Sequence, residues 1–335
     1  MEISDTHTLA VTEQSQVNEA RRAIVSMAEN GGLSRKNCDR IAVICAELAT
    51  NLIKHTKSGG SLLAQIIQDG ERIALDLYCR DEGKGMDVKA CIVDGFSSEG
   101  TLGTGLGAIK RMADECEMFS ANQIGTVIHV RIWNAAANAL SQLAWGGLSV
   151  PKKGQLVSGD KWSMNFQNSE VYCLLVDGLG HGIEASDASR LAVKRFKSNF
   201  DLPPAPMLKL LHASLRGSRG AVGAVAKLDL KTKILTFCGL GNIDAIVQTG
   251  AERKHLVSLN GTLGYEARKF NEYSVPWTKD STLVMHSDGF SSKTMQDIEG
   301  METLSAGLMA GLLYQKHAKT SDDATVCVLK HTRSK

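Results

Sequence analysis

The chain has 335 residues, of which 43% are apolar, enough for two domains that each bury a core of their own. Its formal net charge is only +2 and no basic block stands out, so nucleic-acid binding is not expected. No signal peptide and no apolar segment of membrane-spanning length are recognisable, which predicts a cytoplasmic protein without a membrane partner. The eight cysteines form no C-x-x-C pair and lie mostly in apolar runs, as buried thiols of a reducing compartment do.

The first part of the chain mixes helical and strand patterns. Helices are predicted over 15–30 and 34–56, because each stretch has helical composition and is followed by a glycine pair. Strands follow over 62–68 and 72–80, then a helix over 106–117 and a strand over 126–133. The mixture predicts an α/β domain over residues 1–134, with helices layered on one face of a sheet.

The composition changes over residues 135–150, where an Ala/Asn run precedes a glycine pair, and we expect a linker there. The following domain, expected over 151–331, is dominated by short apolar strands with helices over about 184–198 and 207–216. The strands are predicted at 171–176, 221–230, 234–238, 245–249, 282–286 and 324–329. Many strands around a helical pair fit a β-sandwich flanked by helices.

The first polar constellation suits a nucleotide. Glu47, Asn51 and His55 recur every four residues on one helix stripe, a pattern that alone describes the solvated border of an amphipathic helix. However, Asp81 opens the glycine-rich segment DEGKG after a strand, where its carboxylate can accept a hydrogen bond from adenine. A second such segment, residues 103–107, opens a helix, where backbone N–H groups can approach phosphate oxygens. Together these features predict a nucleotide site.

The order and spacing of these three boxes resemble the Bergerat-fold ATPases. More narrowly, AELATNLIKHT, DEGKGM and DGFSSEGTLGTGLGAIKRMADECEM resemble the small anti-sigma-factor serine kinases, especially the switch kinase of the stressosome. The resemblance implies that ATP and Mg²⁺ bind, that Glu47 orients or activates the attacking hydroxyl, that Asn51 holds Mg²⁺ and that Asp81 reads adenine. It further implies a pocket floor and a phosphate cover formed by Gly83, Gly85, Gly103, Thr104, Gly105 and Gly107. Lys84 stands where many relatives carry proline, and no phosphoacceptor-histidine helix precedes the domain, which argues against a histidine kinase.

The second constellation consists of four acidic motifs at predicted strand ends: SGD at 158–160, DGLGHG at 177–182, SDG at 287–289 and SDDAT at 321–325. Each alone describes a common turn or a solvated pair. Four in order predict a cleft lined by carboxylates, the ligands that Mg²⁺ and Mn²⁺ prefer, whereas the Cys/His spacing of a zinc site is missing. Two such ions can activate a shared water for attack on a phosphate ester.

This half resembles the metal-dependent protein phosphatases of the sporulation stage II E type, through LLVDGLGHGIEAS, VMHSDGF and SDDATVCVLK. The resemblance implies two Mn²⁺ or Mg²⁺ ions and catalysis centred on Asp177, which would bridge them. It implies further metal contacts from the Gly178 carbonyl, Asp288 and Asp322. Asp160 would contact a metal or a metal-bound water. Asp323 is expected behind these ligands, and His181 in a structural role rather than as a general acid. Gly241-Asn242 resembles a family turn beside the cleft whose role stays open.

Two functional hypotheses follow, because the two resemblances correspond to opposing enzymes of one switching pathway. The first is a bifunctional regulator that phosphorylates and dephosphorylates a serine or threonine of a STAS-domain protein. The alternative is a serine phosphatase whose N-terminal domain binds ATP and a partner without transferring phosphate. A non-enzymatic scaffold would need neither set of polar residues. Further expected partners are a sigma factor or another switch protein, and a second copy of the chain, since kinases of this type often dimerise.

Overall fold

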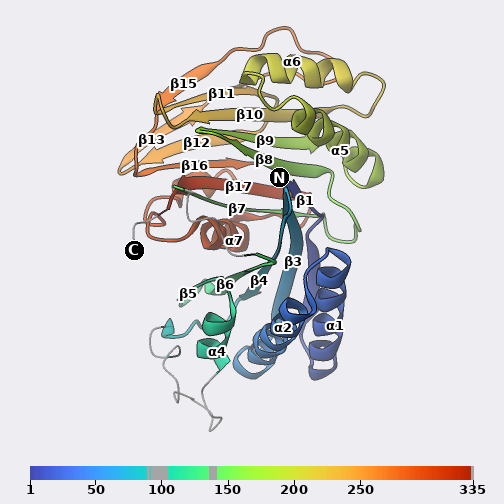
Figure 1. Cartoon of the computed structure of the whole chain (residues 1–335), viewed down its shortest axis with the longest axis vertical. Helices are drawn as coiled ribbons and strands as arrows, with labels where there is room; N and C mark the ends of the chain where they lie inside the picture. The colour runs from blue at the N-terminus through green and yellow to red at the C-terminus, as the bar shows by residue number, and fades with distance from the viewer. Residues whose placement is uncertain (89–90, 92–104, 136–141, 333–335) are drawn as a thin grey trace. The chain divides into compact units, whose positions relative to one another are not determined.

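The computed structural model describes residues 1–88, 91, 105–135 and 142–332 (Figure 1). The chain divides into two compact units. The N-terminal unit comprises Thr6–Leu140, and the C-terminal unit comprises Ser141–Lys335 together with Met1–Asp5. None of the helices in the described part of the chain has both the length and the apolar character needed to cross a membrane.

The N-terminal unit is an α/β sandwich, as the sequence predicts. Its helices are α1 (Gln14–Asn30), α2 (Arg35–His55) and α4 (Gly105–Met112). Its strands are β2 (His7–Val11), β3 (Gly60–Asp69), β4 (Arg72–Asp81), β5 (Glu115–Ala121) and β6 (Gly125–Trp133). The strands pair antiparallel in the order β2-β3-β4-β6-β5, and the helices cover one face of this sheet.

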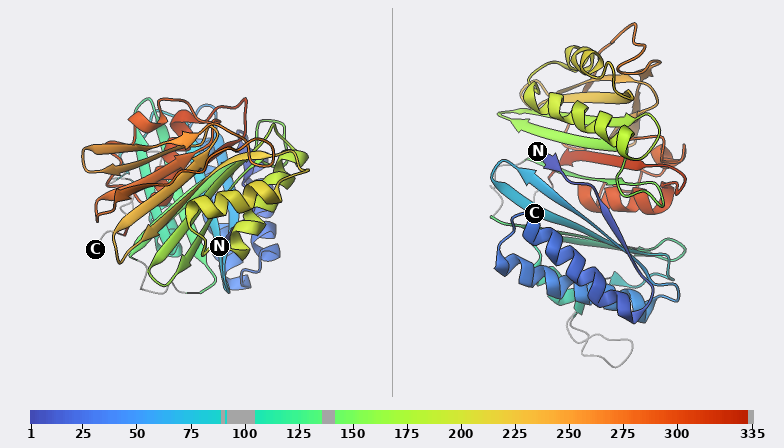
Figure 2. Two further views of the ribbon diagram at one scale, coloured as in Figure 1. Left: turned by 90° about the horizontal axis from the view of Figure 1, so that it is seen from above. Right: turned by 90° about the vertical axis from the view of Figure 1, so that its right-hand side faces the viewer.

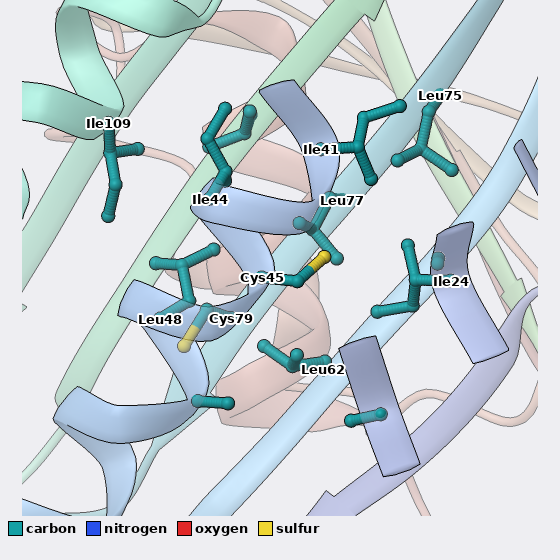
Figure 3. Packing of buried hydrophobic residues seen from close by; sticks show 14 of the residues in the cluster. Ile24, Ile41, Ile44, Cys45, Leu48, Leu62, Leu75, Leu77, Cys79 and Ile109 are labelled. Atoms are coloured by element: carbon teal, nitrogen blue, oxygen red, sulfur yellow. The ribbon is translucent and has the colours of Figure 1, made fainter. Parts of the chain in front are cut away.

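The core of this unit lies between α2 and the sheet (Figure 3). Ile41, Ile44 and Leu48 form the buried stripe of α2, and Leu75 and Leu77 of β4 meet them from the sheet. All five side chains are fully buried, as the helical and alternating patterns predict. Burying each contributes about 1.5–3 kcal/mol relative to exposure. This packing fixes α2, and with it the polar stripe that borders the core.

The opposite face of β4 and β6 carries a buried ion pair. Asp76 is fully buried, and Arg131 donates to both of its carboxylate oxygens, at 2.6 and 2.9 Å. His129 contacts the same carboxylate at 3.1 Å, and the Gln65 amide lies 3.5 Å away. Burial alone would raise the pKa of Asp76, but Arg131 and His129 hold it below its usual range. The alternation of β4 therefore places a charge pair, not a solvated row, opposite its apolar face.

The helix expected over 106–117 is too long. The structure ends α4 at Met112 and places Glu115–Ala121 in β5, paired with β6. Asp114 forms the break, because its carboxylate accepts a 2.7 Å hydrogen bond from the Trp133 N–H and pairs with Arg40 at 2.9 Å. These partners lie far away in the sequence, which is why helical composition alone overextends the element.

The C-terminal unit is a β-sandwich flanked by helices, again as predicted (Figure 2). One sheet has the order β14-β11-β10-β9-β8, with β15 on β11, and the other has the order β13-β12-β16-β17-β7. The first sheet comprises β8 (Asp160–Gln167), β9 (Glu170–Gly178), β10 (Ala221–Asp229), β11 (Ile234–Leu240), β14 (Ser258–Leu259) and β15 (Tyr273–Pro276). The second comprises β7 (Leu143–Val150), β12 (Asp244–Thr249), β13 (Glu252–Leu256), β16 (Ser281–His286) and β17 (Ala324–His331).

Helices cover the outer face of each sheet. The pair α5 (Ile183–Ser198) and α6 (Pro204–Ser214) packs on the first sheet and closely matches the two predicted helices (Figure 2). A third helix, α7 (Ala306–His317), packs on β7 and β17 and was not predicted. It is buried around most of its circumference, so it lacks the one-sided apolar period by which a surface helix is recognised. A short 3-10 turn, η1 (Thr294–Gln296), precedes it.

The linker expected over 135–150 is wrong in its second half, because Leu143–Val150 form β7 in full register with β17. Gly146 and Gly147, which suggested a linker, instead leave room for neighbouring elements to pack on β7. A Cβ at Gly146 would lie about 2.5 Å from the Gly307 backbone of α7. A Cβ at Gly147 would lie 2.8 Å from the Trp162 ring. The glycines therefore allow a helix and a tryptophan to approach this edge strand closely.

A short segment from the other end of the sequence completes this unit. Met1–Asp5, including strand β1 (Glu2–Ile3), lies along β8 and α5. Asp5 pairs with the buried Lys161 and, at 3.0 Å, with Arg190. Ser163 donates to the Met1 carbonyl at 2.9 Å, and Lys197 pairs with Glu2 at 2.6 Å. The C-terminal unit is therefore built from two separate stretches of chain.

Candidate functional site

Both sheets of the C-terminal unit deliver carboxylates to one end of the sandwich. Asp160 begins β8 and is the direct partner of Asp177 on β9. Asp288 follows β16 and Asp322 precedes β17 in the other sheet. Asp177, Asp288 and Asp322 line a cavity of about 470 Å³. The fold thus brings three of the predicted carboxylates to a cleft open to a ligand and buries the fourth, Asp160, beside Asp177.

Glycine is required directly beside two of these carboxylates. A Cβ at Gly178, next to Asp177, would collide with the carbonyl of Ala185 on α5. A Cβ at Gly289, next to Asp288, would collide with the Asp323 carbonyl. The Asp-Gly pairs of the motifs are therefore not simple turns. They let a helix and a neighbouring strand end approach the cleft closely.

Asp323 has a different task from its neighbour Asp322. Its two carboxylate oxygens accept hydrogen bonds from the Lys152 N–H at 2.7 Å and the Gly159 N–H at 2.8 Å. These bonds join the loop before β8 to the start of β17. Asp322, in contrast, lines the cavity. The arrangement favours Asp322 as a cation contact and gives Asp323 a supporting position.

The carboxyl groups of the cleft are buried close to one another, and the surrounding protein does not compensate the negative charge that they would carry when ionised. Burial raises the pKa of Asp177 to about 10, reinforced by Asp160, Asp288 and Asp322. Burial likewise raises the pKa of Asp160 to about 7, in spite of a hydrogen bond from Ser287. The Oδ2 atom of Asp160 is buried without a hydrogen-bond partner in the described part of the chain. Buried, mutually repelling carboxylates with an orphaned oxygen are a fitting environment for cations.

The donor set suits hard cations that keep part of their water shell. Among the described residues, no three His, Cys, Asp or Glu side chains are grouped closely enough to hold one ion between them. Mg²⁺ in proteins is commonly bound through one or two carboxylates, with water completing the octahedron. Carboxylates that reach one cleft from two sheets match this mode of binding, whereas a closed all-protein cage, typical of structural zinc, does not form.

Several cleft residues had not been assigned from the sequence. Asn242 donates a 2.6 Å hydrogen bond to Asp288, which gives the Gly241-Asn242 turn the task of orienting that carboxylate. Lys319 reaches the Asp288 carbonyl at 2.6 Å. Lys152 and Asn260 line the same cavity, as does His181, for which the sequence predicted a structural role. Lys152 lies in a basic pair next to the expected linker, and that basic pair is the one sequence signal that could have marked it.

The N-terminal unit brings the predicted nucleotide residues together in two groups. In the first, Glu47 on α2 lies next to the start of α4, where a Cβ at Gly105 would come within 2.6 Å of the Glu47 carboxylate. Asn51 lies one turn further along the same helix and is partly buried. Gly107 is buried in the first turn of α4. The Glu47 carboxylate thus faces a helix N-terminus, where phosphate oxygens can find N–H donors.

The second group lies where β4 ends. Asp81 accepts a 2.7 Å hydrogen bond from the Gly83 N–H, and Thr56 lies beside the same glycine. Gly85 has φ +76°, and a Cβ there would come within 2.7 Å of the Ala121 backbone. The segment after Asp81 therefore needs glycine both for its conformation and for its close contact with β5. Two predicted phosphate-covering residues, Gly103 and Thr104, lie outside the described residues.

Comparison with known families agrees with both halves. Residues 10–132 match the histidine kinase-like ATPase domain, and residues 167–332 match Stage II sporulation protein E. The chain therefore joins a histidine kinase-like ATPase domain to a domain with the fold of the PPM serine/threonine phosphatases. The resemblances inferred from the motifs are confirmed for each half of the chain.

Individual relatives cover one half each. The phosphoserine phosphatase RsbX of Bacillus subtilis is 25% identical over 142 residues, 42% of this chain and 71% of its own length. The serine/threonine-protein kinase RsbT of the same organism is 28% identical over 132 residues, 39% of this chain and 98% of its own length. A crystal structure of RsbX in complex with magnesium has a TM-score of 0.51 at 20% identity, covering 57% of this chain and 96% of that one.

Proposed function

We propose that this chain is a bifunctional partner-switching regulator that phosphorylates and dephosphorylates a serine or threonine of a STAS-domain protein. The observation that carries the proposal is the convergence of Asp177, Asp288 and Asp322 from both sheets on one cleft of the phosphatase unit. Asp160 is buried beside them as the strand partner of Asp177. A second site, where Glu47 faces the start of α4, lies in the ATPase unit of the same chain. One relative is a kinase and the other a phosphoserine phosphatase, which supports opposing activities on one substrate.

In the phosphatase unit, Asp160, Asp177, Asp288, Asp322 and the Gly178 carbonyl would hold Mg²⁺ or Mn²⁺. The magnesium bound to RsbX supports this assignment. The bound ions would supply a water of lowered pKa for attack on phosphorus. The products are the free serine hydroxyl and inorganic phosphate.

The unit's other cleft residues position the substrate and the ligands. Asn242 keeps the Asp288 carboxylate turned into the cleft through its 2.6 Å hydrogen bond. The Lys152 side chain lines the same cavity and provides a positive charge for the phosphate group of the phosphoserine.

In the ATPase unit, Asp81 would accept a hydrogen bond from the adenine amine. Asn51 would hold the Mg²⁺ that accompanies ATP. The backbone N–H groups that open α4 would bind phosphate oxygens. Glu47 would accept the proton of the substrate hydroxyl as that oxygen bonds to the γ-phosphorus, while ADP leaves. Apart from this Mg²⁺, the transfer needs no group beyond ATP and the substrate.

Both activities acting at once on one serine would only hydrolyse ATP, so the two sites must be separable. We expect Glu47→Ala to end phosphotransfer to a STAS-domain protein while the hydrolysis of p-nitrophenyl phosphate continues. Asp288→Asn should instead let the phosphorylated STAS protein accumulate in the presence of ATP, because only the hydrolytic site is damaged. The phosphorylated fraction is measured over time with radiolabelled ATP.

The Asp288→Asn variant also decides between the two functional hypotheses. If it accumulates no phosphoprotein with any STAS-domain protein, while the wild-type chain dephosphorylates the same protein after phosphorylation by another kinase, phosphotransfer is refuted. The ATPase unit would then be a nucleotide-dependent regulator of the phosphatase.

A further inference from the structure

Exposed apolar side chains concentrate around the phosphatase cleft. Among the described residues, eight large hydrophobic side chains are exposed, and four of them belong to segments that line this cleft or lie next to it. They are Leu156, Ile183, Tyr265 and Leu179, which are 92%, 72%, 66% and 37% exposed. We refer to these four residues as the rim surface. Single exposed apolar residues are ordinary, but a group of them beside a candidate active site indicates a binding surface.

The rim surface is continuous with the cleft. Leu179 and Gly180 line the cavity that contains Asp177 and also a neighbouring cavity of about 830 Å³. Leu191 and Tyr265 form apolar parts of the wall of this second cavity. A substrate whose phosphate enters the first cavity can therefore place adjacent side chains in the second.

The loop before β8 extends the rim surface on the other side. A Cβ at Gly182 would lie 3.1 Å from the side-chain oxygen of Gln155, so this loop contacts the turn before α5. Leu156 is the next residue of the loop, and Ile183 is the first residue of the helix. Both side chains are thus presented near the same turn.

Polar contacts hold the rim residues in place without burying them. The Arg219 Nε donates to the Leu179 carbonyl at 2.9 Å, and its guanidinium pairs with Glu184. The Tyr265 ring packs over Gly220, where a Cβ would come within 2.7 Å of it, and its hydroxyl donates to the Ser218 carbonyl at 3.3 Å. The surface is therefore largely formed before a partner arrives, which lowers the entropic cost of binding.

We propose that the rim surface binds apolar side chains that flank the phosphoserine of the protein substrate. The inference rests on the proposed phosphatase function and adds the chemistry by which the substrate is selected. Glu184, Asp187 and Arg219 in the second cavity carry one net negative charge. The recognised flank is therefore apolar with a basic rather than an acidic edge.

The test uses the full-length chain with Mn²⁺ and phosphoserine peptides of equal length. One peptide has Leu and Lys around the phosphoserine, and a second has Asp at the same positions. We expect the wild-type chain to hydrolyse the first with a kcat/KM at least about tenfold higher, the discrimination typical of apolar pockets. The double variant Ile183→Ser/Tyr265→Ser should lose this preference. The ratio of its kcat/KM on the first peptide to its kcat/KM on p-nitrophenyl phosphate should fall, relative to the wild-type ratio, by the same factor.

The control is Ile234→Ser, which changes another exposed apolar residue. Ile234 lies at the opposite end of β11 from the cleft, roughly 20 Å away along the strand. The control should keep the wild-type preference. Equal rates of the wild-type chain on the two peptides, or an unchanged preference in the double variant, would overturn the inference. A wild-type chain that hydrolyses neither peptide nor p-nitrophenyl phosphate would instead refute the proposed phosphatase function itself.

Discussion

Replacing Asp177 by asparagine should end hydrolysis and, at the same time, stabilise the metal-free protein. Burial and the neighbouring carboxylates of Asp160, Asp288 and Asp322 raise the pKa of Asp177 to about 10. Ionising this group in the folded unit therefore costs free energy when no cation compensates it. An amide of the same shape removes the charge and also removes the proposed bridging ligand.

The sign of the pH dependence follows from proton binding. A carboxyl whose pKa is higher in the folded than in the unfolded chain retains its proton longer when folded. The stability of the metal-free protein should therefore fall as the pH rises above about 4. Each pKa unit corresponds to about 1.4 kcal/mol. The four units between about pH 4 and pH 8 set an upper limit of about 5–6 kcal/mol. Because Asp160 and Asp177 interact and share this shift, we expect a gain of about 2 kcal/mol for Asp177→Asn at pH 8, roughly 4–8 °C in Tm.

Scanning calorimetry in EDTA at pH 5 and pH 8, with and without added Mg²⁺, measures this effect. Wild-type Tm should fall between the two pH values in EDTA and recover with Mg²⁺. The variant should fall less, because only the raised pKa values of Asp160 and Asp288 remain, and should recover less with Mg²⁺. Asp187→Asn is the matched control, because it makes the same substitution at a carboxylate that is 66% exposed. Its ion pair with Arg190, at 3.9 Å, is solvated and contributes little to stability. A variant that melts at or below the wild-type temperature in EDTA at pH 8 would refute the electrostatic reasoning.

Three further predictions address other sites. Asp81→Asn should weaken ATP binding by about 1.5–3 kcal/mol, because it removes a hydrogen bond to a charged group. Unchanged affinity of the folded variant in a calorimetric titration would contradict the nucleotide assignment. Arg131→Leu should cost about 3–5 kcal/mol in urea unfolding, because it leaves Asp76 buried without its main partner, and a loss below about 1 kcal/mol would argue against the ion pair. Asn242→Ala should raise the Mn²⁺ concentration needed for p-nitrophenyl phosphate hydrolysis about 10–100-fold, because Asp288 loses the hydrogen bond that orients it. EDTA should abolish the activity of the wild-type chain, and chelator-insensitive hydrolysis would exclude a metal-dependent reaction.

The sequence was most informative where local chemistry and local geometry coincide. The acidic motifs predicted strand ends because Asp-Gly pairs stop strands, and Asp177 and Asp288 do lie where β9 ends and after β16. The stripe of α2 likewise predicted the core, and with it the position of Glu47. Such features depend on residues close together in the chain, so their periodicity and spacing can be recognised.

The features that could not be predicted depend on distant partners. The residues near Asp76 in the sequence do not indicate that Arg131, 55 positions later, pairs with it inside the protein. Helix α7 lacks the polar face that marks a surface helix. Gly146 and Gly147 in β7 are residues typical of a linker. Their presence is explained by helix α7 and the Trp162 ring, which pack directly on them.

The placement of Met1–Asp5 bears on how this chain can be divided. A fragment of residues 141–335 would contain every cleft carboxylate but would lack Asp5, the partner of Lys161, whose side chain is only 9% exposed. An unpaired, buried ammonium directly after Asp160 would destabilise the first strand of the cleft. Residues 6–140 form a continuous stretch and can be excised with their core intact. Deletion of the ATPase unit should therefore keep the first five residues, joined by a flexible linker to the C-terminal stretch.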